Sequence, residues 1–190
     1  MAKLKWGMIG GGEGSQIGPA HRLGSGLDGL FEFTAGALDH RAAEGIDYGQ
    51  RLGLGDRAYG SWQDMLAGES AREDRIDLVT VATPNSTHFE ITKAFLEAGF
   101  HVLCEKPIGL TSAEGQQLVD AGKQHPKLKL MEAFMYRHHP QWLRARQIVR
   151  DGGIGELCTI QSAFSYFNDD AGMAGEIFGA KRAAYGRETA

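Results

Sequence analysis

Short apolar runs and segments of helical periodicity alternate along the first 151 residues of the chain. The apolar runs have the length and composition of strands and lie at 4–9, 31–38, 76–82, 100–104 and 128–133. Apolar residues recur at helical spacing at 17–23, 41–52, 88–98, 111–125 and 140–151. Strands that are apolar throughout are typical of a parallel sheet covered by helices on both faces. Because crossover connections are right-handed, the pattern predicts an α/β fold with a doubly wound parallel sheet.

The pattern changes after Gly152. Residues 157–167 are predicted to form one long strand with aromatic side chains, which suits an antiparallel sheet in a second, α+β domain. Residues 169–190 have no repeat and no convincing strand. We therefore expect a first domain at 1–131, the incomplete start of a second domain at 132–168, and an atypical tail at 169–190.

Composition narrows the class of partner. The formal net charge of −4 leaves no excess of Lys and Arg to neutralise phosphates, so we expect no nucleic-acid partner. No apolar run reaches the roughly 18 residues of a membrane span, so we expect no membrane partner. Two cysteines are too few for a disulfide framework, which favours a reducing, cytoplasmic location.

Local signals predict the character of several other segments. Ser61 followed by Asp64 is typical of a helix cap. The charged stretch 69–75 predicts a solvated surface loop. His138 and His139 are adjacent, but no Cys or carboxylate cluster accompanies them at ligand spacing, so no metal site is expected.

The first predicted strand ends in a glycine-rich turn that is typical of dinucleotide-binding βαβ units. Gly10 and Gly12 follow the strand and Gly18 opens the next helix, whereas the strict spacing would put the third glycine at Ser15. The turn is therefore about three residues longer than usual, and the alternative is a plain strand–helix connection. We expect a pyrophosphate at the helix N-terminus. The residues expected to bind it are Gly10, Gly12, Glu13, Gly14, Ser15, Gln16 and Ile17.

The end of the second strand is where the adenosine ribose of such a cofactor lies. Asp39 stands there, followed by His40 and Arg41. An acid that accepts hydrogen bonds from the ribose hydroxyls favours NAD, but a guanidinium suits a 2′-phosphate, so Arg41 leaves NADP open. We therefore expect NAD or NADP, with NAD slightly favoured.

Two further strand ends carry residues suited to binding or catalysis. One is the run from Ala82 through Thr83, Pro84 and Asn85 to His88, and the other is Cys104-Glu105-Lys106-Pro107. A lysine at a strand end can donate to a substrate hydroxyl or carbonyl and take part in proton transfer. His88 suits either a pocket or a plain helix start, and Cys104 suits a buried small side chain better than a nucleophile. His21 and His101 are expected to be structural, hydrogen-bonded residues.

These segments resemble the glucose-fructose oxidoreductase / inositol dehydrogenase / rhizopine-catabolism (Gfo/Idh/MocA) family. The resemblance covers roughly residues 3–168, and its most specific part is Glu105-Lys106-Pro107 in the context of 98–107. It also includes the glycine turn with 18–21, the segment 82–88 and the segment 132–141.

The resemblance implies a Rossmann-type cofactor domain and a role for each segment. Ala82, Thr83, Pro84, Asn85 and His88 would line the nicotinamide side of the cofactor. Glu105 and Lys106 would contact the nicotinamide ribose and the substrate, with Lys106 in the catalytic group. Tyr136 and Arg137 would border the active site, and Arg137 is also expected to contact the cofactor. The substrate would be a sugar or polyol, and full-length relatives would be homo-oligomers.

Members of this family are normally longer, with a C-terminal half that supplies substrate contacts and an Asp-x-Gly-x-x-His or Tyr acid/base segment. A truncated or frame-shifted gene product would explain the absence of that segment here. Three hypotheses follow. The chain transfers hydride as an NAD(P)-dependent oxidoreductase, or it binds the dinucleotide without turnover, or it is a fragment unable to fold stably.

Overall fold

The computed structural model describes residues 2–163 and 165 of the chain. Contacts between residues divide the chain into two units, Met1–Ala133 and Phe134–Ala190. All the strands found among the described residues belong to the first unit. None of the helices in the described part of the chain is long and apolar enough to cross a bilayer.

Five strands form one parallel sheet in the first unit. They are β1 (Leu4–Gly10), β2 (Phe31–Ala37), β3 (Leu78–Ala82), β4 (His101–Cys104) and β5 (Leu130–Glu132). Their order in the sheet is β2-β1-β3-β4-β5, and every neighbouring pair is parallel. The predicted doubly wound parallel sheet is confirmed. Gly10 pairs with Ala82 and Val81 pairs with Cys104, so the carboxyl ends of the central strands are level.

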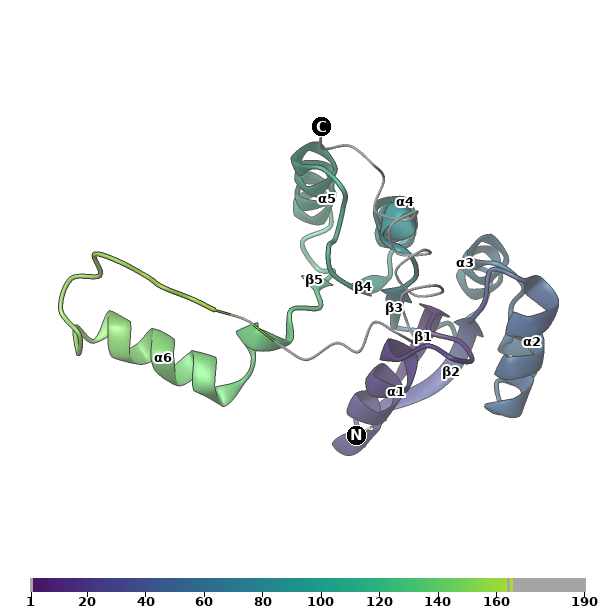
Figure 1. Ribbon diagram of the computed structural model, residues 1–190. Helices are drawn as coiled ribbons and strands as arrows, with labels where there is room; N and C mark the ends of the chain where they lie inside the picture. The colour runs from purple at the N-terminus through teal and green to yellow at the C-terminus, as the bar shows by residue number, and fades with distance from the viewer. Residues whose placement is uncertain (1, 164, 166–190) are drawn as a thin grey trace. The chain divides into compact units, whose positions relative to one another are not determined.

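Helices connect successive strands, as the alternating pattern predicts. They are α1 (Ile17–Leu27), α2 (Ala42–Arg51), α3 (Trp62–Ser70), α4 (His88–Glu97) and α5 (Ser112–Gln124). Figure 1 shows α1 on one face of the sheet and α4 and α5 on the other. This division follows from right-handed crossovers. In the sheet, β2 and β3 lie on opposite flanks of β1, so the connection from β1 to β2 and the later connections run in opposite directions and cross opposite faces. The gap between β1 and β3 at their carboxyl ends is therefore the switch point where such folds bind ligands.

The core forms because the strands are apolar on both faces. The larger buried cluster packs β1, β3 and β4 against α4 and includes Val79, Val81, Phe95 and Phe100. A smaller cluster on the other side of the β1 strand includes Trp6 and Met8. The Trp6 indole Nε1 donates to the buried Thr80 hydroxyl at 2.8 Å, which satisfies the polar end of the ring. The predicted cap is also confirmed, since the Asp64 N–H donates to Ser61 Oγ at 3.1 Å.

The predicted solvated loop at 69–75 is wrong at its start, since Glu69 and Ser70 belong to α3. Glu69 is fully buried at the end of α3, where its carboxylate accepts two bonds from the Arg57 guanidinium, at 3.0 and 2.5 Å. The Tyr59 hydroxyl and the Ile76 N–H each donate to Glu69 at 2.9 Å. A charged sequence stretch therefore contains a buried carboxylate, because its partners come from the segment 57–59 and from Ile76.

The second unit contains the helix α6 (Pro140–Arg150), which begins with proline at its first position. The strand predicted at 157–167 is wrong for residues 157–163 and 165, which are not in a strand. A strand needs a hydrogen-bonding neighbour, and none of the described residues pairs with this segment. The rest of that prediction, and the whole tail at 169–190, lie outside the described residues.

Candidate dinucleotide-binding site

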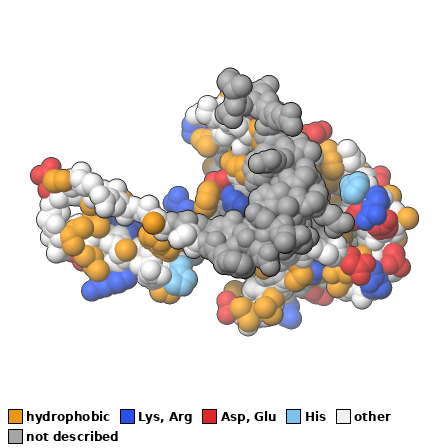
Figure 2. All heavy atoms as spheres, viewed as in Figure 1, with side chains coloured by type: hydrophobic (Ala, Val, Ile, Leu, Met, Phe, Trp, Pro, Cys, Tyr) orange, Lys and Arg blue, Asp and Glu red, His pale blue; other side chains and the backbone are white. Residues whose placement is uncertain are grey.

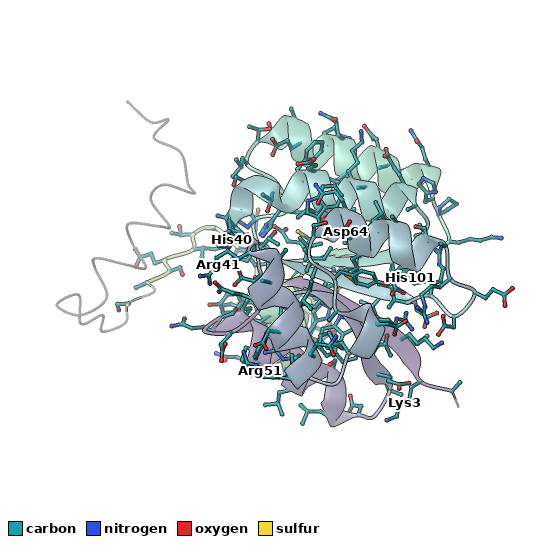
Figure 3. All side chains as sticks on the ribbon, turned by 90° about the vertical axis from the view of Figure 1, so that its right-hand side faces the viewer. Lys3, His40, Arg41, Arg51, Asp64 and His101 are labelled. Carbon is teal, nitrogen blue, oxygen red and sulfur yellow. The ribbon has the colours of Figure 1, made fainter. Side chains whose placement is uncertain are left out.

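The candidate segments of the first unit all follow strands at one edge of the sheet. In Figure 3, His40 and Arg41 lie on one side, just after β2, and Lys3 and His101 lie on the other, near the amino ends of β1 and β4. The glycine turn, the segment 82–88 and the segment 104–107 follow or end β1, β3 and β4, so the parallel sheet brings them to the same edge as Asp39.

The glycine turn is packed too closely for side chains at several positions, Gly12 and Gly18 among them. A Cβ added to Gly12 would lie 2.3 Å from the Leu38 carbonyl oxygen, and one added to Gly18 would lie 2.0 Å from the Gly11 carbonyl oxygen. Gly18 therefore lets α1 approach the turn closely, which is the function of the third glycine in dinucleotide-binding turns. The longer spacing of this turn preserves that contact.

The turn also presents backbone donors. Among the described residues, the N–H groups of Gly12, Glu13 and Gly14 have no hydrogen-bond acceptor. Ser15 completes the turn, since its N–H donates to the Gly12 carbonyl and its Oγ accepts from the Gly18 N–H, both at 3.1 Å. Free N–H groups next to the N-terminus of an 11-residue helix suit an anion such as a pyrophosphate.

A hollow of about 460 Å³ opens between the glycine turn, the end of β2 and one side of α2. Charged side chains dominate its lining, and Figure 2 shows acidic and basic groups gathered over α2. The residues that line it are Glu13, Asp39, Arg41, Ala43, Glu44, Asp47, Tyr48 and Arg51. It brings together the predicted pyrophosphate and ribose residues, Glu13, Asp39 and Arg41, on one surface.

The Asp39 carboxylate already accepts hydrogen bonds from a neighbouring residue, Arg41. The carboxylate accepts from the Arg41 N–H at 2.9 Å and from the Arg41 guanidinium at 3.3 Å, and Arg41 also pairs with Glu44. Burial acts to raise the pKa of Asp39, but the hydrogen bonds and charge of Arg41 outweigh it and lower the pKa below its ordinary value. The carboxylate is therefore ionised at neutral pH and able to accept from ribose hydroxyls.

Glu105 and Lys106 follow β4 and differ in exposure. The Glu105 carboxylate lies 2.9 Å from His21 Nε2 on α1 and accepts from the Lys106 N–H at 3.2 Å. Burial acts to raise the pKa of Glu105, but the bond and charge of His21 outweigh it and lower the pKa. Lys106 is exposed, so its ammonium can reach a molecule bound at this edge. His21, predicted to be a structural residue, thus orients a predicted site residue.

His88 is buried behind the loops after β3 and β4. Its ring nitrogens lie 2.6 Å from the Pro107 carbonyl oxygen and 2.8 Å from the Thr83 carbonyl oxygen. His88 therefore joins the two loops through their backbone carbonyls. In the loop after β3, solvent can reach Thr83 and Asn85, which are partly exposed, and Pro84, which is exposed. Cys104 is also buried, which raises the pKa of its thiol to about 12 and agrees with the prediction that it is not a nucleophile.

Tyr136 and Arg137 belong to the second unit, where both are exposed, and the Tyr136 ring packs edge-on against Trp142 at 6.0 Å. Their predicted place at the border of an active site stays a prediction. His138 and His139 belong to no group of three or more His, Cys, Asp or Glu side chains able to hold a metal ion within the described part of the chain.

Residues 4–134 match the model of the Gfo/Idh/MocA family, described as an oxidoreductase family with an NAD-binding Rossmann fold. The chain belongs to this family. The resemblance and the Rossmann-type fold inferred from the sequence are confirmed, and the family cofactor is NAD or NADP, as expected.

Relatives and solved structures agree with this assignment. The chain is 41% identical over 165 residues to an uncharacterized oxidoreductase of Bacillus subtilis, covering 86% of this chain and 42% of that protein. It is 34% identical over 182 residues to the NADP⁺-dependent D-xylose 1-dehydrogenase of Hypocrea jecorina, covering 90% of this chain and 44% of that protein. An inositol dehydrogenase homolog of Azotobacter vinelandii, solved with NADH and myo-inositol, superposes on this chain with a TM-score of 0.77 at 39% identity. The match covers 81% of this chain and 41% of that structure. The chain thus spans less than half the length of these relatives.

Sequence reasoning missed the residues that surround the glycine turn from α1 and α2. Arg22, Tyr48 and Arg51 bond to the turn or to one another, yet none belongs to a recognisable motif. One signal was present, since Arg41, Glu44, Tyr48 and Arg51 recur every three or four residues and so share one side of α2. The bond from Arg22 to the turn had no such signal.

Proposed function

We propose that this chain binds NAD or NADP and serves an oxidoreductase that transfers hydride between the cofactor and a carbon bearing a hydroxyl or carbonyl group. The observation that carries the proposal is the row of N–H groups at Gly12, Glu13 and Gly14, which have no acceptor in the described part of the chain and lie at the same sheet edge as Lys106. The N–H groups suit a pyrophosphate, and Lys106 suits proton transfer to a substrate oxygen.

The residues would divide the cofactor among them. Gly10, Gly12 and residues 13–17 would bind the pyrophosphate, and Asp39 and Arg41 the adenosine ribose. Residues 82–85 would face the nicotinamide, with His88 supporting them from behind. Glu105 would accept a hydrogen bond from the nicotinamide ribose. When bound, the nicotinamide supplies the carbon that accepts or donates hydride.

Lys106 would act on the substrate oxygen. An exposed ammonium can donate to a carbonyl oxygen as it becomes a hydroxyl, and the reverse transfer serves oxidation. Lys106 stands beside the Glu105 carboxylate, which accepts from the Lys106 backbone N–H. That bond fixes the backbone from which the lysine side chain extends.

The substrate would be a sugar or polyol. Support comes from relatives named D-xylose 1-dehydrogenase and levoglucosan dehydrogenase, and from the homolog solved with myo-inositol. Both cysteines are free, which fits the reducing cytoplasm that we expect for the protein. Homo-oligomerisation of full-length relatives stays a prediction.

A second candidate is binding of the dinucleotide without turnover. It is favoured by one observation, that the family match at residues 4–134 is to the NAD-binding fold. The two candidates share the cofactor site and differ only in catalysis.

Calorimetric titration with NADH and NADPH tests the cofactor site. Affinity weaker than about millimolar for both would contradict the proposal. Turnover on a panel of aldoses and polyols then separates the enzyme from the passive binder.

Lys106→Ala tests the catalytic assignment. We expect kcat to fall about 10²–10⁴-fold, because a positioned proton donor is lost, while NADH affinity is kept. Lys93→Ala is the matched control, since Lys93 is a partly exposed lysine on α4 that pairs with Glu97. Unchanged turnover in Lys106→Ala would rule out the proposed role.

A further inference from the structure

Three side chains of α1 and α2 form a cluster beside the glycine turn. The Arg22 guanidinium donates to the Tyr48 hydroxyl at 3.0 Å and lies 5.6 Å from the centre of the Tyr48 ring. The Arg51 guanidinium lies 5.0 Å from the centre of the same ring. Two arginines thus share one tyrosine, and each of them also bonds to the turn. We refer to these three residues as the Arg22–Tyr48–Arg51 cluster.

Arg22 determines the orientation of one peptide plane in the turn. Its Nη1 donates to the Gly11 carbonyl oxygen at 2.8 Å. The Gly11–Gly12 peptide bond is trans, so the Gly12 N–H points away from the Gly11 carbonyl. The Gly12 N–H is one of the donors with no acceptor among the described residues. Arg22 therefore turns this donor away from α1 and leaves it open to a ligand.

Arg51 bonds to the turn two residues further on. Its guanidinium donates to both carboxylate oxygens of Glu13, at 3.0 and 2.6 Å, and to Asp47 at 3.0 Å. The bond and charge of Arg51 lower the pKa of Glu13, so the pair stays ionised well below neutral pH. Arg51 also offsets a carboxylate that would otherwise repel a phosphate. Gly12 lies between the two bonded residues, Gly11 and Glu13.

We propose that the Arg22–Tyr48–Arg51 cluster positions the glycine turn for the cofactor pyrophosphate, with Arg22 directing the Gly12 N–H towards it. The three residues are positioning residues, since none of them has to touch the cofactor. The proposal rests on the proposed dinucleotide function and assigns residues that lie outside the glycine motif. It explains why a turn longer than usual keeps a defined shape.

The experiment compares Arg22→Met with Arg75→Met. Arg75 is a matched control, because its guanidinium also donates to a glycine carbonyl, Gly99 at 2.6 Å, and also lies over an aromatic ring, Phe100 at 4.0 Å. Gly99 and Phe100 precede β4 and lie at the amino end of the sheet, away from the turn. Calorimetry measures NADH affinity, thermal unfolding monitors the fold, and the amide proton shift of Gly12 reports its hydrogen bond.

We expect NADH to bind Arg22→Met about tenfold more weakly than the unaltered chain, as for one lost charge-assisted hydrogen bond. The Gly12 amide proton should move downfield when NADH binds the unaltered chain and should move less in Arg22→Met. Tyr48→Phe, which keeps the ring and loses the hydroxyl, should show a smaller loss. Arg75→Met should change only thermal stability.

Two results would overturn the proposal. If the unaltered chain binds NADH and Arg22→Met binds it equally well with the same Gly12 shift, the cluster does not position the turn, although the proposed function stands. If NADH binds neither protein, both proposals fail. Arg51→Gln keeps the test open should Arg22→Met be unstable, because the Arg51 side chain is 49% exposed, and its loss should still weaken NADH binding.

Discussion

Two arginine–glutamate pairs in the first unit have the same chemistry and opposite surroundings. Both are bidentate, with Arg57 bound to Glu69 and Arg51 bound to Glu13. The side chains of the first pair are 9% and 0% exposed, whereas those of the second are 49% and 67% exposed. The first pair joins the end of α3 to the segment before that helix, and the second joins α2 to the glycine turn.

The two pairs show that burial determines how much an ion pair contributes to stability. Removing one partner of a buried pair leaves an uncompensated charge in the interior, which is strongly destabilising. An exposed pair contributes little to stability because water and salt screen it. The Arg57–Glu69 pair is therefore structural, while the Arg51–Glu13 pair can serve ligand binding at little cost to the fold.

The largest effect is expected for Glu69→Gln. It leaves the Arg57 guanidinium without its main counter-charge and should lower the free energy of unfolding by about 3–5 kcal/mol, measured by urea denaturation. Glu13→Gln, the same substitution in the exposed pair, is the control and should unfold like the unaltered chain. Equal losses in the two variants would contradict the comparison.

A smaller effect is expected for Tyr59→Phe, which removes one donor to Glu69 and should cost about 1 kcal/mol. Burial, followed by the Glu69 bond, raises the pKa of Tyr59 to about 12. In a double-mutant cycle, Tyr59→Phe should cost less in the Glu69→Gln background, because the charged acceptor is already lost. Additive losses would show that the two side chains act independently.

The third prediction concerns Glu105 and His21, a pair of intermediate burial whose side chains are each 14% exposed. The contribution of this pair to stability should be lost at acidic pH. The pKa of Glu105 is lowered on folding, so the unfolded chain binds its proton more readily. The stability that Glu105 contributes is present above its ordinary pKa of 4.5 and is lost as the pH falls through the lowered value. Glu105→Gln should remove this part of the acid dependence. An unchanged profile would mean that the pair adds nothing.

The smallest effect on stability is expected for Arg51→Gln. Because the pair with Glu13 is exposed, the urea midpoint should stay within experimental error at low and high salt. NADH affinity should fall nonetheless, by less than in Arg22→Met. A clear loss of stability would place this pair with Arg57 and Glu69 as a structural contact.

The fold could be predicted because its signal is local and repeated. Buried parallel strands are apolar along their whole length, and each predicted strand up to residue 133 has a counterpart in the sheet. The predicted strand at 157–167 fails among its described residues because an aromatic, β-rich sequence still needs a neighbour to pair with.

The candidate site was only partly predictable. The glycine turn and Glu105-Lys106 could be recognised because their residues are contiguous. The partners of these residues could not, since His21 is 84 positions from Glu105 and Arg51 is 38 positions from Glu13. Glu69 was misjudged for the same reason, because burial depends on Arg57, Tyr59 and Ile76 as a group, not on the charges next to it.

The opposite surroundings of the two cysteines have a practical consequence. Cys104 is buried, which raises the pKa of its thiol to about 12, whereas Cys158 is exposed in the second unit. A maleimide fluorophore should therefore attach at Cys158 alone, without any engineered residue. Reduced nicotinamide is itself fluorescent, so energy transfer from bound NADH to that label would report how the second unit responds as substrates are added. Cys158 is thus a native labelling site for measuring distances by energy transfer.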